Sequence, residues 1–271
     1  MKYRPSLGAR GCYDREIDRK AFMKQILAAF IFFTRLPFWR IATVQNRYYA
    51  RVVAYWPLTG WLTAAVMAGT MYGAAFLWPV QVAVALAMLV RVLLTGALHE
   101  DGLSDFLDGF GGGASPKQTL DIMKDSRTGS YGIIGLILYF LLQFAILSSL
   151  PIMVSCAVVL CADPFCKFAA ATTINFLPYA RTSEQSKSGV VYQAMRPFEL
   201  VFAAVTGILP MLLFASSEYW IAALAPLLCS WLLVRWMKRR IGGYTGDCCG
   251  ASFLICEGVF YLAFSALYWL G

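Results

Sequence analysis

The chain has 271 residues, of which 59% are hydrophobic and only 14% are charged, and its formal net charge is +8. A soluble domain of this length carries charge on roughly a quarter of its residues. The composition therefore excludes an ordinary water-soluble fold and predicts an all-α, polytopic membrane bundle.

The N-terminal segment is polar and basic and precedes a short apolar run. Residues 1–20 are expected to form a disordered cytoplasmic tail, and residues 21–271 a single integral membrane domain. The apolar run Ile26–Phe33 is too short to cross a bilayer, which takes about 20 residues. We therefore predict an interfacial or re-entrant helix there. No small-residue cleavage site follows, which argues against a signal peptide.

Seven later segments are apolar and long enough to be transmembrane helices. They are Val52–Trp78, Val80–Leu98, Gly132–Leu150, Ile152–Leu177, Phe198–Ala215, Tyr219–Met237 and Ala251–Leu270. The three short connections between them lack Lys and Arg, whereas the N-terminal segment and the three longer loops are basic. The positive-inside rule places these basic segments in the cytoplasm and the C-terminus outside. The lipid bilayer is thus the expected partner, and the positive charge requires no nucleic acid.

Three aspartates follow the second predicted span. If that span continues as a helix past Leu98, then Asp101, Asp105 and Asp108 lie at positions i, i+4 and i+7, within about 60° of one another on one face. Carboxylates so placed repel one another, and a divalent cation removes the repulsion. With only oxygen ligands, and a single histidine, His99, in the chain, the pattern favours Mg²⁺ or Mn²⁺ over zinc. The alternative is a solvated acidic helix face.

A glycine-rich break and a second helix come next. Residues 111–113 are all glycine, and Ser115-Pro116 with Gln118 form a helix start with a capping box. We expect this helix to reach about Lys124.

The turn that follows is the second group of candidate site residues. Asp125 adds a carboxylate, and Arg127 can bind a phosphate through two hydrogen bonds. A carboxylate-held metal beside Arg or Lys is typical of phosphoryl transfer. Lys124, Ser126 and Gly129 therefore join the predicted site as substrate-binding residues.

Two further loops carry candidates on the same predicted side. The turn GGYTGD brings Asp247 and backbone amides that glycine leaves accessible, so Asp247 is a predicted metal ligand. Arg181 follows the fourth span and either binds a phosphate or only orients the chain.

Four charged residues lie inside predicted spans, where charge is costly unless paired or functional. Asp163 and Lys167 are spaced i, i+4 and can neutralise each other. Arg91 is expected to be paired, and Glu257 to be near Asp247, where it could line the site. His99 either orients a carboxylate, carries a proton or is simply interfacial.

Motifs along nearly the whole chain resemble the cobalamin synthase (adenosylcobinamide-GDP ribazoletransferase) family of bacteria. They are FFTRLP (Phe32–Pro37), WPLTG (Trp56–Gly60), TGALHEDGLSDFLDGFGGG (Thr95–Gly113), LDIMKDSRTGSYG (Leu120–Gly132), LPYAR (Leu177–Arg181) and GGYTGDCCGA (Gly242–Ala251). The chain departs from the family pattern at two places. The family often has an apolar residue where this chain has Glu100, and it usually has an arginine around Asp163–Lys167.

The resemblance implies a Mg²⁺-dependent transferase of the bacterial inner membrane. A ribose hydroxyl of α-ribazole, or of its 5'-phosphate, attacks adenosylcobinamide-GDP and GMP leaves. The aspartate motif of the family corresponds to Asp101, Asp105 and Asp108, and its DSR-x-G turn to Asp125–Gly129. Our hypothesis is that these aspartates hold the metal with Asp125 or Asp247, that Arg127 and Lys124 neutralise the departing GMP, and that Asp105 or Asp108 accepts the proton. A homo-oligomer is also compatible with the sequence.

Two other functions remain under consideration. A CDP-alcohol phosphotransferase also uses aspartates at the membrane boundary, but its D-G-x2-A-R pattern expects an Ala-Arg pair where this chain, after Asp101-Gly102-Leu103-Ser104, has Asp105-Phe106. A cation or corrinoid transporter is a non-enzyme alternative. The clustering of the acids at one face and the lack of an inverted repeat argue against it.

Overall fold

The computed structural model describes residues 7–181, 190–214 and 216–271. The described elements are α1 (Leu7–Phe33), η1 (Phe38–Arg40), η2 (Asn46–Tyr55), α2 (Trp56–Ala74), α3 (Val80–Thr95), α4 (Leu98–Gly112), α5 (Pro116–Lys124), α6 (Ser130–Ser149), α7 (Ile152–Ala171), α8 (Thr173–Phe176), α9 (Pro197–Ile208), η4 (Leu209–Leu213), η5 (Ser217–Ala223), α10 (Leu224–Ile241) and α11 (Gly246–Leu270). Over these residues the chain is helical without a named strand, which confirms the predicted all-α class.

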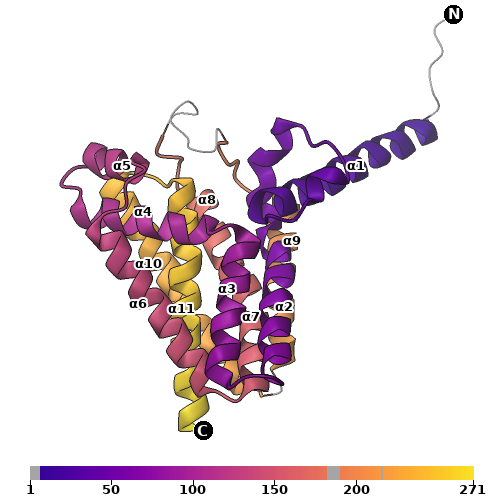
Figure 1. Ribbon diagram of the computed structural model, residues 1–271. Helices are drawn as coiled ribbons and strands as arrows, with labels where there is room; N and C mark the ends of the chain where they lie inside the picture. The colour runs from indigo at the N-terminus through magenta and orange to yellow at the C-terminus, as the bar shows by residue number, and fades with distance from the viewer. Residues whose placement is uncertain (1–6, 182–189, 215) are drawn as a thin grey trace, which may run out of the picture.

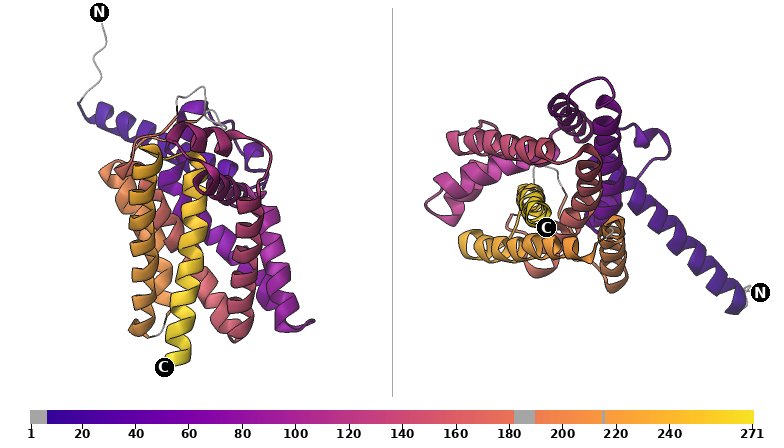
Figure 2. Two further views of the ribbon diagram at one scale, coloured as in Figure 1. Left: turned by 90° about the vertical axis from the view of Figure 1, so that its left-hand side faces the viewer. Right: turned by 90° about the horizontal axis from the view of Figure 1, so that it is seen from below.

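The long helices stand side by side as a bundle (Figure 1). Helices α1, α4 and α5 and the long loops gather at one end, and the C-terminus lies at the other (Figures 1 and 2). The basic loops therefore share one end of the molecule, as the charge pattern predicts. We call this the loop end.

Five helical segments are long and apolar enough to cross a membrane, or six if a bent pair counts as one span. The five are Asn46–Ala74, Ser130–Ser149, Ile152–Phe176, Glu218–Ile241 and Gly246–Leu270. Each of the seven predicted spans corresponds to helix, but two are not single long spans. The fifth is the shorter apolar stretch Pro197–Leu213, and its predicted end, Ala215, lies outside the described residues. The second is the bent pair.

The helices differ in how much of their surface is inside the protein. Two thirds (67%) of the apolar windows around α2 and α7 is buried, against 22% in α6 and 28% in the η5–α10 segment. Helices α2 and α7 therefore form the centre, and α6 and α10 expose apolar side chains to lipid. Gly60 allows the central contact, because a β-carbon there would lie 2.8 Å from Pro164 Cα.

Helix α3 does not continue through the aspartates. It ends at Thr95, and α4 leaves at 89° to it. The turn uses Gly96 (φ 66°) and Ala97 (φ 57°), both in the left-handed region. Glycine adopts this conformation freely, whereas for alanine it costs roughly 1–2 kcal/mol. The prediction of a continuous second span was therefore wrong, but the aspartates still share one helix, which crosses the loop end of the bundle (Figure 1).

The N-terminal helix is longer than expected. The predicted short helix over residues 26–33 is the last part of α1, which begins at Leu7. Helical backbone thus extends into the segment expected to be a disordered tail, of which residues 1–6 lie outside the described part. Helix α1 lies at the loop end and extends away from the bundle axis (Figures 1 and 2).

The four charged residues predicted inside the spans form two buried pairs. Arg91 contacts Glu257 at 2.6 Å, with side chains 3% and 0% exposed, and Glu257 also accepts hydrogen bonds from Tyr139 and Tyr261. The predicted pairing of Arg91 is confirmed, and its partner is Glu257. Glu257 therefore does not line the candidate site, as had been considered from the sequence.

The second buried pair is the one that its spacing predicts. Lys167 lies 2.5 Å from Asp163, and both side chains are fully buried. Thr63 of α2 bonds to both members of the pair, since it donates to Asp163 Oδ2 at 2.9 Å and accepts from Lys167 Nζ at 2.6 Å. The charges therefore neutralise each other and join α2 to α7.

Candidate active site

Helix α4 crosses the start of α11 at very short range. A β-carbon at Gly102 would lie 3.0 Å from the Asp247 carbonyl oxygen, and one at Gly250 would lie 3.4 Å from His99 Cα. Glycines at both positions let the two backbones approach. The crossing brings Asp101 of α4 and Asp247 of α11 to the same region, although they are far apart in sequence.

Two loops of the loop end are joined beside this crossing. Ala180 donates its amide to the Tyr244 carbonyl at 2.8 Å, and Tyr244 donates to the Pro178 carbonyl at 3.0 Å, which makes a short parallel bridge. The bridge fixes the backbone next to Arg181, which directly follows Ala180. It also fixes the start of α11, where Thr245 caps the helix by accepting from the Cys248 amide at 3.3 Å.

A cavity of about 240 Å³ opens where these elements meet. Its lining combines polar residues from α4, α11 and the bridged loops with aromatic residues from α1, α2 and residues 190–196. The lining residues are Phe32, Phe33, Val53, Trp56, Leu98, His99, Asp101, Tyr179, Arg181, Tyr192, Gly246, Asp247, Cys249 and Gly250. Three predicted site residues, Asp101, Arg181 and Asp247, are therefore brought together.

Arg181 connects the cavity to α5. Its guanidinium donates to the Leu120 carbonyl at 3.0 Å and lies 3.7 Å from the Asp247 carboxylate. The Arg181 side chain is 4% exposed and that of Asp247 14%, whereas Asp101 is exposed. The cavity therefore has two carboxylates and a fixed cation, with Asp101 nearest to solvent.

Asp108 makes backbone contacts that its helical spacing did not predict. It is buried, and its two oxygens accept hydrogen bonds from the Gly129 amide (2.7 Å) and the Gly132 amide (2.9 Å). Side chains at these glycines would collide with Asp108. Asp108 thus anchors the turn before α6, and its carboxylate is already occupied by protein donors.

The Asp108→Asn variant is expected to lose stability. An amide side chain can accept from only one of the two N–H groups, so a buried, charge-assisted hydrogen bond is lost at about 1–3 kcal/mol. Thermal unfolding in detergent and limited proteolysis of the turn 124–130 measure the effect, with the exposed Asp121→Asn as control. An unchanged unfolding temperature together with lost activity would show that Asp108 acts on substrate or metal and not as an anchor.

The turn itself is held away from the cavity carboxylates. Arg127 and Asp125 form an ion pair at 2.7 Å with side chains 87% and 38% exposed. The hydrogen bonds from Arg127 lower the pKa of Asp125 to about 2, so this carboxylate stays ionised at physiological pH. Lys124 and Ser126 are exposed beside the pair. These residues line the surface at the loop end and not the cavity.

The preceding helix begins and ends as predicted, but the predicted capping box is only half formed, because Gln118 accepts from Ala114 and not from the N-cap residue Ser115. Helix α5 begins at Pro116 and ends at Lys124, with the Ser115 hydroxyl accepting from the Gln118 amide at 3.2 Å. The Gln118 side chain accepts from the Ala114 amide at 2.9 Å. The break before it begins at Gly113, after α4 ends at Gly112.

The carboxylates of the cavity suit a hard cation. No group of three or more His, Cys, Asp or Glu in the described part of the chain is close enough to hold a metal, so the five predicted ligands do not form one cage there. Mg²⁺, however, is usually held by one or two carboxylates and completes its shell with water and substrate phosphates. Asp101 and Asp247 provide such a pair. Asp105 is buried one turn further along α4 and does not line the cavity.

The aromatic wall of the cavity was not predicted as functional. Phe33 and Trp56 are nearly parallel with centroids 5.1 Å apart, and Tyr192 meets Phe32 edge to face. They come from separate parts of the chain. Their only signal in the sequence was that Phe32, Phe33 and Trp56 lie in the FFTRLP and WPLTG motifs of the resemblance.

Comparison with known proteins decides the family. A family model described as cobalamin-5-phosphate synthase matches residues 25–265. The chain belongs to the cobalamin-5-phosphate synthase family. The part that matches the cobalamin-5-phosphate synthase model contains every residue that lines the cavity and leaves out most of α1.

Curated relatives agree with this family across nearly their full length. The chain is 38% identical over 254 residues to the adenosylcobinamide-GDP ribazoletransferase of Shewanella amazonensis, covering 92% of this chain and 97% of the relative. It is 38% identical to that of Ralstonia pickettii (83% and 89% covered) and 33% identical to that of Vibrio cholerae (89% and 92%). No solved structure matches the chain.

Proposed function

We propose that this protein joins α-ribazole, or its 5'-phosphate, to adenosylcobinamide-GDP and releases GMP, the step that completes the nucleotide loop of cobalamin. The observation that carries the proposal is the similarity to enzymes with this name over 92% of the chain. The cavity supports it, because Asp101, Asp247 and Arg181 together suit a diphosphate and its metal.

The reaction is a displacement at phosphorus. The ribose hydroxyl oxygen forms a bond to the phosphorus on the cobinamide side of the diphosphate, and the bond from that phosphorus to the oxygen of GMP breaks. Mg²⁺, held by Asp101 and Asp247, would neutralise the diphosphate and the charge that develops on GMP. Arg181, fixed by the Leu120 carbonyl, is placed to bind a phosphate oxygen.

The remaining roles follow from what each side chain already contacts. Asp108 accepts hydrogen bonds from two amides. Asp105, the other predicted proton acceptor, is buried one turn from Asp101 and does not line the cavity, so it could accept the hydroxyl proton only if its side chain turned into the cavity. Arg127 and Lys124 are exposed at the loop end, where they can meet the part of a large substrate that extends beyond the 240 Å³ cavity. The basic loops at this end support a cytoplasmic site on the inner membrane.

A direct assay tests the proposal and the metal requirement. Purified protein in nanodiscs is incubated with adenosylcobinamide-GDP and α-ribazole, and GMP is measured by chromatography. We expect GMP release with Mg²⁺, none after treatment with EDTA, and recovery when Mg²⁺ is added in excess, because the carboxylates of Asp101 and Asp247 repel a diphosphate unless a cation lies between them.

Other outcomes would contradict the proposal. Release of CMP from a CDP-alcohol, without GMP from the first substrate pair, would favour a CDP-alcohol phosphotransferase. Ion flux in proteoliposomes without any GMP release would favour a transporter. Full activity in EDTA would remove the metal from the mechanism.

A further inference from the structure

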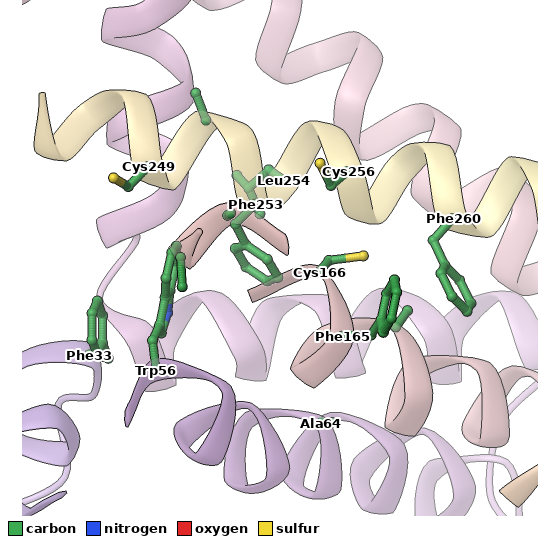
Figure 3. Close-up of a cluster of buried hydrophobic side chains, with 14 of the residues drawn as sticks. Phe33, Trp56, Ala64, Phe165, Cys166, Cys249, Phe253, Leu254, Cys256 and Phe260 are labelled. Carbon is green, nitrogen blue, oxygen red and sulfur yellow. The ribbon is translucent and has the colours of Figure 1, made fainter. Parts of the chain in front are cut away.

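The inner wall of the cavity is aromatic and almost completely buried. Trp56 is 1% exposed, His99 3% and Phe33 5%. Figure 3 shows Phe33 and Trp56 side by side, with Phe253 of α11 on the other side of Trp56. The His99 ring lies 5.3 Å from Trp56 and 5.1 Å from Phe253. The carboxylates belong to the part of the cavity that is nearer to solvent, since Asp101 is exposed and the Asp247 side chain is 14% exposed.

Two polar atoms of this wall have no hydrogen-bond partner in the described structure. They are the indole Nε1 of Trp56 and the Nε2 of His99, both buried. Buried polar groups are nearly always hydrogen-bonded, and one that is not calls for an explanation such as a missing ligand. Both residues line the same cavity, although solvent does not reach either nitrogen in this conformation, so one molecule that displaces these side chains on binding could provide both partners.

The two parts of the cavity suit different parts of one nucleoside. A flat, largely apolar ring with few polar edge atoms fits the wall of Phe32, Phe33 and Trp56. A ribose and its phosphate fit the part with Asp101 and Arg181. Guanine fits the wall poorly, because its edge carries a carbonyl, a ring N–H and an amino group, and each needs a partner when buried.

We propose that the aromatic wall binds the benzimidazole base of α-ribazole, so that the ribose hydroxyl points to the carboxylates. The inference rests on the proposed function and assigns the buried end of the cavity to the nucleophile and not to GDP. The base has one ring nitrogen that can only accept a hydrogen bond. Trp56 Nε1 can only donate, and His99 Nε2 can donate or accept, so the wall can satisfy the ring nitrogen and one ribose hydroxyl.

Ring-preserving substitutions test the assignment. Trp56→Phe and His99→Phe remove the nitrogen atoms but keep aromatic packing. Each is expected to raise the KM for α-ribazole about 3- to 10-fold, the range for loss of one neutral hydrogen bond. The KM for adenosylcobinamide-GDP should stay within about twofold. Calorimetric titration of α-ribazole alone should show the same weakening, and this readout does not depend on turnover.

A matched control exists on the same helix. Trp61 also donates its indole N–H, to the Thr206 carbonyl at 2.7 Å, but it does not line the cavity. Trp61→Phe should therefore leave both KM values unchanged. Thermal unfolding of all variants shows whether packing is preserved.

A ligand change gives an independent test. The indole analogue of α-ribazole lacks the ring nitrogen that accepts a hydrogen bond. Wild-type protein should bind this analogue more weakly than α-ribazole, and one of the two wall variants should bind both equally.

Several results would overturn the inference. A rise in the KM for adenosylcobinamide-GDP alone would place the other substrate at the wall. Unchanged α-ribazole binding in both wall variants, or an equal effect of Trp61→Phe, would leave the wall a packing feature only. GMP release with unaltered α-ribazole affinity would thus reject the subsite and keep the function. Weakened α-ribazole binding by the wall variants of a protein that releases no GMP would keep the subsite and reject the proposed function.

Discussion

Replacing Asp101 or Asp247 by asparagine is expected to reduce the rate of GMP release about 100- to 1,000-fold. Each change keeps the shape of the side chain but removes one of the two carboxylates that line the cavity. A neutral amide binds a hard cation far less well, so charge on the diphosphate is less well balanced in the transition state. The Asp247 variant also removes the carboxylate that lies 3.7 Å from Arg181. Steady-state assays over a range of Mg²⁺ concentrations measure the effect.

The control for this pair is Asp121→Asn. Asp121 lies at the loop end on α5, where it forms an exposed ion pair with Lys117 at 2.7 Å, and exposed pairs of this kind contribute little to stability. Near-normal turnover by both the Asp101 and the Asp247 variants would refute a metal site in the cavity. Loss of activity in Asp125→Asn alone would move the site to the exposed turn.

Replacing Glu257 by alanine is expected to destabilise the protein by about 3–5 kcal/mol, since it leaves Arg91 buried without a counter-ion. The pair is 2.6 Å apart and nearly inaccessible to solvent. Arg91 also donates to the Tyr139 hydroxyl at 2.6 Å, which cannot replace a negative charge. Unfolding in detergent with increasing denaturant, and the yield of folded protein in membranes, measure the loss.

The double variant Arg91→Met with Glu257→Leu separates pairing from packing. It removes both charges and keeps comparable volume, so we expect it to recover much of the stability that the single variant loses. A single Glu257→Ala variant as stable as wild type would show that the pair contributes nothing to folding. Additive losses in the double variant would show that the two side chains act independently.

The sequence predicted the helices better than their paths. Apolar length located helix at all seven predicted spans, and the alternation of basic and uncharged connections predicted which loops share an end. The capped start of α5 was predicted to the residue, because Ser115, Pro116 and Gln118 act through local hydrogen bonds and a fixed φ. The 89° turn after α3 was missed, because an Ala in the left-handed region, at Ala97, leaves no compositional signal.

For the candidate site too, the sequence predicted which residues share an element but not what each of them contacts. Spacing placed Asp101, Asp105 and Asp108 on one helix, and periodicity could not tell that Asp108 faces two backbone amides while Asp101 faces a cavity. The ion pair of Arg127 with Asp125 is local, yet the sequence did not show that it stays on the surface.

The sequence by itself determined a helical membrane protein, the charged ends of its helices, the Asp163–Lys167 pair and the residue types of the proposed diphosphate site. These features depend on hydropathy, helical spacing and local capping, all of which act within a few residues. The tertiary structure decided that Asp101 lines one cavity with Asp247 and Arg181, that Glu257 pairs with Arg91, and that the same cavity has an aromatic wall. Those contacts join residues far apart in the chain, and the one between α4 and α11 depends on Gly102 and Gly250, which let the two helices cross closely.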